Sequence, residues 1–133
     1  MMLLRAISAE ACVEAFVAAL IGRDLEAALA LLTDDVVLLY SNGSAVWGKS
    51  QFADLMSANW KLVDRYEYRT LNSVWTGKCE TVAAVAYSFA WSGVANGKDV
   101  SGGGRGTRVL RRDPDSGWRI SHEHLSIGQW KSG

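Results

Sequence analysis

Arg108 and Glu123 are the two side chains of this sequence with the clearest capacity for chemistry. A guanidinium can hold a carboxylate or a carbonyl oxygen, and a glutamate can accept a hydrogen bond or take up a proton. Tyr40 is the third candidate, because a phenol beside them could polarise a carbonyl. These three are the candidate catalytic residues. The alternative for Arg108 and Glu123 is a structural buried ion pair without a functional role.

The dipeptide Asn96-Gly97 predicts which side chains accompany Arg108. Asn-Gly is typical of a two-residue hairpin turn, in which both turn residues adopt positive φ. If Ala95 faces Lys98 across this turn, Val85 lies opposite Arg108. The same register places three large rings opposite glycines: Tyr87 opposite Gly106, Phe89 opposite Gly104 and Trp91 opposite Gly102. A later turn over residues 114–117 places Glu123 opposite Arg108.

A further turn at Gly77-Lys78 would place Tyr68 beside Tyr87 and Tyr66 beside Phe89. Side chains alternate across a sheet, so one face should carry the Arg108 and Glu123 pair together with these rings. That face predicts a ligand pocket. Its candidate ligand-binding residues are Tyr66, Tyr68, Asn72, Tyr87, Phe89 and Trp91, with Trp60 from a helix as a further candidate that also suits the core or the rim.

The opposite face carries smaller side chains, which suit packing against a second copy of the chain. They are Ala84, Ala86, Ser88, Ala90, Thr107, Val109, His122 and His124. Two histidines at this spacing could bind a metal if a third ligand converged, and none is evident, so no metal is predicted. No cofactor is predicted either, because residues 102–106 are rich in glycine but lack the spacing of a nucleotide-binding loop.

Helices and strands must hold these faces in place. Ser8 predicts a helix up to Gly22, Asp24 a second over Leu25–Leu32, and Ser50 a third up to Val63. A first strand is expected at 36–40, and four long strands at 65–76, 81–94, 99–112 and 118–130. Helices followed by antiparallel strands indicate an α+β fold, and residues 1–133 form a single predicted domain.

Composition limits the classes of partner. The 133 residues are 49% hydrophobic and 21% charged, and Lys plus Arg equals Asp plus Glu at 14 each. This balance disfavours nucleic acid and anionic membranes as partners. No apolar run reaches the roughly 20 residues of a membrane span, and charges interrupt the N-terminal apolar stretch before signal-peptide length. Cys12 and Cys79 lack pairing or metal spacing, so both should be reduced and the location cytoplasmic.

The last two predicted strands carry the most specific pattern, with Arg105-Gly-Thr-Arg-Val-Leu-Arg-Arg-Asp113, a turn, and Gly117-Trp-Arg-Ile-Ser-His-Glu-His-Leu-Ser126. This pattern resembles the nuclear transport factor 2-like superfamily, in particular its SnoaL-like and ketosteroid-isomerase-related domains. It is also similar to the association domain of calcium/calmodulin-dependent protein kinase II. The resemblance implies a cone-shaped, curved antiparallel sheet that encloses a pocket with three helices of the N-terminal half, and a homodimer through the outer sheet face.

The resemblance also bears on two site residues. In the kinase association domain the arginine that matches Arg108 lines the pocket. In ketosteroid isomerases the general base is an aspartate at the end of the first strand, where this sequence has Tyr40. Ketosteroid isomerase activity is therefore not expected.

The leading functional hypothesis is a homodimeric domain that binds a small, largely apolar ligand with an anionic or carbonyl end. One alternative is an isomerase, cyclase or dehydratase, without metal, that uses Glu123 as a proton shuttle. Another alternative is a homo-oligomeric assembly module like the kinase association domain.

Overall fold

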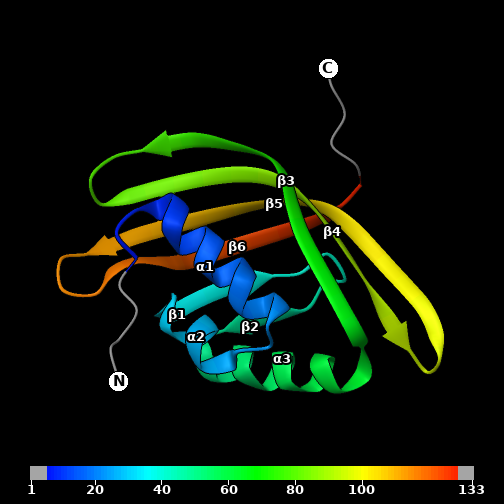
Figure 1. The fold of residues 1–133 in the computed structure, drawn as a ribbon. Helices are drawn as coiled ribbons and strands as arrows, with labels where there is room; N and C mark the ends of the chain where they lie inside the picture. The colour runs from blue at the N-terminus through cyan, green and yellow to red at the C-terminus, as the bar shows by residue number, and fades with distance from the viewer. Residues whose placement is uncertain (1–5, 129–133) are drawn as a thin grey trace.

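A computed structural model describes residues 6–128, which fold into three helices and a six-stranded sheet (Figure 1). The helices are α1 (Ala9–Ile21), α2 (Leu25–Ala30) and α3 (Lys49–Leu62). The strands are β1 (Leu32–Leu39), β2 (Ala45–Trp47), β3 (Asp64–Lys78), β4 (Val82–Ala95), β5 (Lys98–Asp113) and β6 (Gly117–Ile127). The fold is α+β, as predicted. The short strand β2 was not predicted, and residues 129 and 130 of the predicted last strand lie outside the described residues.

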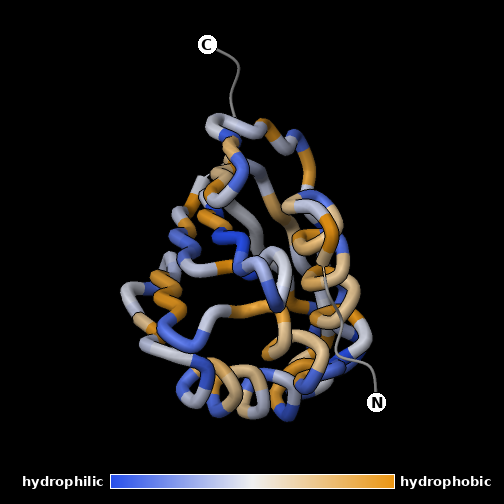
Figure 2. Tube along the Cα trace, turned by 90° about the vertical axis from the view of Figure 1, so that its left-hand side faces the viewer, coloured by the Kyte–Doolittle hydropathy of each residue, from blue (hydrophilic) through white to orange (hydrophobic). Residues whose placement is uncertain are grey.

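The sheet is open and strongly curved, with the strand order β2-β1-β6-β5-β4-β3. All neighbouring strands are antiparallel except β1 and β6, which run parallel. The helix α1 lies across the sheet, and α3 lies along the edge of the molecule at the bottom of both views (Figures 1 and 2). Along α3 hydrophobic and hydrophilic residues alternate in Figure 2, as expected of an amphipathic helix with one buried face.

The predicted caps explain where two helices begin. The Ser8 hydroxyl accepts a hydrogen bond from the Ala11 N–H at 3.0 Å, and the Asp24 carboxylate accepts one from Ala27 at 3.1 Å. The predicted cap at Ser50 is wrong. The cap residue is Gly48, two positions earlier, so α3 begins at Lys49; the φ of 89° at Gly48 favours glycine. The helix α2 ends at Ala30 because the chain enters β1 at Leu32.

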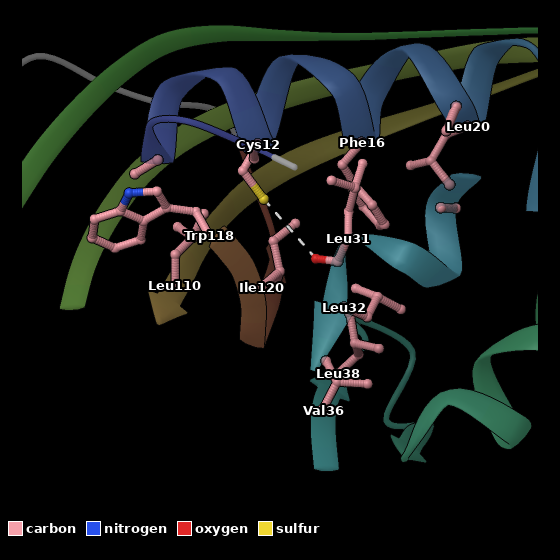
Figure 3. Packing of buried hydrophobic residues seen from close by; sticks show 14 of the residues in the cluster. Cys12, Phe16, Leu20, Leu31, Leu32, Val36, Leu38, Leu110, Trp118 and Ile120 are labelled. Carbon is pink, nitrogen blue, oxygen red and sulfur yellow. Dashed lines mark hydrogen bonds between the residues drawn. The ribbon is translucent and has the colours of Figure 1, made fainter. Parts of the chain in front are cut away.

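The hydrophobic core lies between α1 and the strands β1, β5 and β6 (Figure 3). Cys12, Phe16 and Leu20 point from α1 toward the sheet, where they meet side chains such as Ile120 and Leu38. Burial raises the pKa of the Cys12 thiol to about 12, and its Sγ lies 4.0 Å from the carbonyl oxygen of Leu31. Cys79 is exposed, and both cysteines are free, which confirms the prediction of two thiols.

The two hairpin registers that matter most are confirmed. Ala95 faces Lys98, which aligns Val85 with Arg108, and Arg108 in turn lies opposite Glu123. The predicted pairs of rings and glycines are present as well: Tyr87 with Gly106, Phe89 with Gly104 and Trp91 with Gly102. The Asn96-Gly97 turn shows why, because both residues adopt positive φ, at 53° and 75°.

The predicted register between β3 and β4 is wrong. Tyr68 pairs with Trp91 rather than Tyr87, a slip of four residues. The turn does not form at Gly77-Lys78, because β3 continues to Lys78 and the connection spans residues 79–81. Since a slip by an even number preserves the alternation of side chains, Tyr66 and Tyr68 stay on the predicted face.

Asn72 leaves that face, contrary to the prediction. Its φ is 57°, within a bulge between Leu71 and Val74 that interrupts the alternation of β3. The side chain is exposed, and its amide donates a hydrogen bond to the Ser88 hydroxyl at 3.1 Å. Asn72 therefore supports the bulge, apart from the rings.

No helix within residues 6–128 has both the length and the apolar character needed to cross a bilayer.

Candidate functional site

A buried ion pair stands at the centre of the concave face of the sheet. Arg108 Nε lies 2.5 Å from Glu123 Oε2, and the two side chains are 1% and 9% exposed. The Nε–H is not aligned for a hydrogen bond, so Arg108 Nε has no acceptor within residues 6–128. The contact therefore stabilises the pair by charge rather than by a directed hydrogen bond.

Two tyrosines complete this group. The Tyr87 hydroxyl donates to Glu123 Oε2 at 2.5 Å, and Arg108 Nη2 donates to the Tyr68 hydroxyl oxygen at 3.2 Å. The Arg108 guanidinium carbon also lies 4.1 Å from the centre of the Tyr87 ring, within cation–π range. We call Arg108, Glu123, Tyr68 and Tyr87 the ion-pair cluster. The opposite charges of Arg108 and Glu123 cancel, and each charged group makes a hydrogen bond with a neutral tyrosine hydroxyl.

Glycines on β5 allow the rings of β4 to lie close to that strand. A Cβ added at Gly106 would lie 2.5 Å from the Tyr87 hydroxyl oxygen, and one added at Gly102 would lie 2.6 Å from Trp91 Nε1. Such approaches are far inside van der Waals contact, so any side chain there would displace the ring. The glycine-rich segment therefore serves packing, and it positions the Tyr87 hydroxyl on Glu123.

The rings of β3 and β4 form a continuous wall beside the cluster. Ring centres are 6.3 Å apart for Tyr66 and Tyr68, 6.5 Å for Tyr66 and Trp91, and 6.2 Å for Tyr68 and Phe89. All three pairs are stacked, a geometry that stabilises aromatic contacts. The wall gives an apolar surface with hydroxyl groups at its edge.

Tyr40 joins this region from the opposite side. It follows β1, whose Leu38 pairs with Glu123, so Tyr40 lies two positions further along the same face. Burial is the main cause that raises the pKa of Tyr40, and the charge of Glu123 adds to it. Burial likewise raises the pKa of Tyr66 and Tyr87, and that of Tyr68 to about 12. All four hydroxyls therefore stay protonated, and able to donate, near neutral pH.

A hollow of about 640 Å³ lies between the end of α1 and the strands β3, β4 and β5, and it includes Tyr68 of the ion-pair cluster. Its lining comes from both faces of these strands, because their residues alternate in direction along each strand. Two ring residues predicted to bind a ligand, Tyr68 and Trp91, line it. Arg108 and Glu123 are not among its lining residues, and Arg108 is connected to the hollow through its hydrogen bond to Tyr68. The full lining is Ile21, Glu67, Tyr68, Arg69, Ala90, Trp91, Ser92, Ser101 and Gly102.

The other predicted residues take supporting positions. Tyr66 and Phe89 stack on lining residues, whereas Tyr40 and Trp60 pack against the hydrophobic core. Sequence reasoning missed Ile21, which is 46% exposed at the end of α1. An apolar residue directly before the helix-ending Gly22 was the available signal for it.

The outer face carries His122 and His124, whose ring centres are 6.4 Å apart. Within the part of the chain that the structure describes, no third histidine, cysteine or carboxylate joins them as a metal ligand.

A curved, open sheet that holds a polar cluster and a wall of rings on its concave side defines a pocket-forming α+β domain. The chain belongs to the SnoaL-like family, since the profile of the SnoaL-like domain matches residues 9–129. A comparison with curated proteins gave no significant match.

Solved structures share this fold at low sequence identity. A nuclear transport factor 2-like protein from Salmonella enterica serovar Typhimurium has a TM-score of 0.79 and 20% identity, covering 92% of this chain and 89% of its own. A putative aromatic ring hydroxylase from Novosphingobium aromaticivorans has a TM-score of 0.81 and 20% identity, with coverages of 93% and 89%. A ketosteroid isomerase-like protein from Erwinia carotovora atroseptica has a TM-score of 0.74 and 22% identity, with coverages of 91% and 94%. At these identities the likeness establishes the fold.

Proposed function

We propose that the protein binds a small, largely apolar molecule in the hollow beside Tyr68 and Trp91, with a carbonyl or anionic end at the Tyr68 hydroxyl. Three features support this function. The hollow has the size of a small-molecule site, its lining includes the aromatic residues Tyr68 and Trp91, and the Tyr68 hydroxyl is bonded to the buried Arg108. Apolar walls with few oriented polar groups are typical of ligand sites in proteins.

The hydrogen bond from Arg108 to Tyr68 is the observation that carries the proposal. Because the Tyr68 oxygen accepts from Arg108, its own O–H remains to donate to a ligand, and the positive charge behind it strengthens that donor. Arg108 then acts through Tyr68 rather than by direct contact with the ligand. Since Glu123 balances the charge of Arg108, a carbonyl fits this donor better than a full anion does.

The alternative enzymatic role for Glu123 is less favoured by the same geometry. Its Oε2 atom is already in contact with Arg108 Nε and the Tyr87 hydroxyl. A proton shuttle would have to use the other carboxylate oxygen, on a residue that does not line the hollow. Binding therefore stands as the main proposal, and an isomerase, cyclase or dehydratase remains the alternative.

Replacement of Tyr68 by Phe should weaken the binding of an aromatic ketone by about fivefold, because the loss of one hydrogen bond costs roughly 1 kcal/mol. Isothermal titration with 1-tetralone measures this loss. Binding of tetralin, which has the same shape without the carbonyl, should not change. Tyr66→Phe is the matched control, since it removes a neighbouring hydroxyl outside the lining of the hollow.

Equal affinities of native protein and Tyr68→Phe for 1-tetralone would contradict the role of the hydroxyl. If 1-naphthoate binds more tightly than 1-tetralone, the anionic end is preferred over the carbonyl. If neither ketone, hydrocarbon nor carboxylate binds, the hollow is not a site for this class of ligand.

We also propose a homodimer through the outer face of the sheet, in a cytoplasmic location that agrees with two free thiols. Leu71 and Val74 are 45% and 49% exposed on this face, opposite the small residues Ser88 and Ala86. Exposed apolar side chains on the face of a sheet suit a contact between copies. Light scattering should give the mass of two chains, and Val74→Arg should give that of one. A native monomer at micromolar concentration would contradict this interface, and a larger ring would favour the assembly module.

A further inference from the structure

A second hollow, of about 550 Å³, lies on the outer face of the sheet, on the side opposite the ion-pair cluster. It is formed by three neighbouring strands, β4, β5 and β6. Its lining consists of Ala86, Arg105, Gly106, Thr107, His122, His124 and Ser126.

The polar side chains of this hollow are cationic, imidazole or hydroxyl groups. Arg105, His122 and His124 supply the nitrogen donors, and Thr107 and Ser126 supply hydroxyls. The lining contains no acidic side chain. Arg105 is exposed, and within residues 6–128 no ion pair joins it to a carboxylate. The hollow therefore holds an uncompensated positive charge with hydrogen-bond donors around it.

The register of the sheet brings these donors together. Arg105 lies directly opposite Ser126, and Thr107 lies directly opposite His124, on the same face of β5 and β6. Opposite side chains in an antiparallel pair have Cβ atoms about 4.5–5.5 Å apart, and diagonal neighbours are also within reach of long side chains. Arg105 and His124 can thus contact the same group from two sides. Both stand on paired strands, so their positions do not depend on a loop.

We propose that this hollow binds the phosphoryl group of a small phosphate ester. A guanidinium fork matches the oxygens of a phosphoryl group, and imidazole and hydroxyl groups complete its hydrogen bonds. The space is of the size that holds a small molecule, far larger than one tetrahedral anion, so the organic part of an ester can lie over Ala86 and Gly106. This site is separate from the aromatic hollow and does not depend on the function proposed there.

A metal ion would be the other occupant that histidines suggest. It is less favoured, because the Arg105 guanidinium in the same lining repels a cation, and no carboxylate lines the hollow.

Isothermal titration with glycerol 3-phosphate, inorganic phosphate and glycerol tests the proposal. Both phosphates should bind and glycerol should not. Arg105→Gln and His124→Gln should each weaken glycerol 3-phosphate binding by at least about tenfold, since each removes a direct contact with the phosphoryl group. Arg112→Gln is the matched control, because it removes an equal charge from the same strand outside the hollow. It should leave the affinity unchanged.

The outcomes separate the sources of the phosphoryl group. Tighter binding of glycerol 3-phosphate than of inorganic phosphate supports an ester, whereas equal affinities support the phosphoryl site alone. An equal loss in Arg112→Gln would show non-specific attraction and overturn the site, as would zinc binding without phosphate binding. Because a second copy could cover this face, the titration is repeated on Val74→Arg. Absence of phosphate binding to the native protein overturns the proposal. If Val74→Arg alone binds phosphate, the second copy covers the hollow in the native protein, and the proposal is overturned as well.

Discussion

Arg108→Met should lower the free energy of unfolding by about 3–5 kcal/mol. Arg108 is 1% exposed, and its loss would leave the Glu123 carboxylate buried beside an apolar side chain. Glu123→Gln should be destabilising for the same reason, since it leaves the guanidinium without its charged partner. The expected cost is large because the remaining charge keeps its desolvation penalty after the attraction is gone. Urea unfolding of each variant measures the change.

The double variant Arg108→Met, Glu123→Met should regain most of the stability that either single variant loses, because neither charge remains buried. Arg111→Met is the control. Arg111 pairs with Asp35 at 2.6 Å on the surface, and exposed pairs of this kind contribute only about 0–1 kcal/mol. Mild effects of both single variants would show that the cluster is hydrated. In the double variant the affinity for 1-tetralone should still fall, because Tyr68 has lost the charge behind its hydroxyl.

The tyrosines should titrate far above their ordinary range in the folded protein. The sequence has four tyrosines, and burial raises the pKa of every one of them, that of Tyr68 to about 12. The ordinary pKa of tyrosine is about 10. A pH titration of tyrosinate absorbance should therefore show almost no ionisation at pH 10 to 11 in native protein, and full ionisation in concentrated urea.

The free energy of unfolding should fall as the pH rises above the ordinary pKa of tyrosine. Because the folded pKa lies above the unfolded one, the unfolded chain loses its protons first as the pH rises. The stabilisation is complete below about pH 10 and is lost between there and the folded pKa. Alkaline unfolding should thus begin in this interval. A tyrosine that ionises near pH 10 in native protein would place at least one hydroxyl in free solvent.

Local signals in the sequence were sufficient for the central strands. Asn96-Gly97 determines a register by the conformation of two residues, and every pair that follows along β4 and β5 is then fixed. The placement of Arg108 beside Glu123 follows from this turn and the next one. The helix caps at Ser8 and Asp24 are local in the same sense.

Features that depend on contacts between distant segments could not be predicted from the sequence. The bulge at Asn72 shows no turn pattern, and its hydrogen bond is made with Ser88 on the neighbouring strand. The parallel pairing of β1 with β6 joins segments more than eighty residues apart, so it leaves no local signal. The bonds of Tyr68 and Tyr87 to the ion pair likewise depend on side-chain directions in four strands, and the predicted anchor Arg108 donates a hydrogen bond to a tyrosine.

Because the glycines of β5 lie opposite the rings of β4, the sizes of the facing residues on these two strands can change only together. A ring on β4 and the glycine opposite it on β5 share one volume, so a larger residue on β5 is compatible only with a smaller one on β4. Bulk can therefore be exchanged between the strands at constant total volume, whereas a change on one strand alone creates a clash or a void. Relatives that accept ligands of other widths should differ at Trp91 and Gly102 together, and libraries for altered ligand selection should randomise these two positions as a pair.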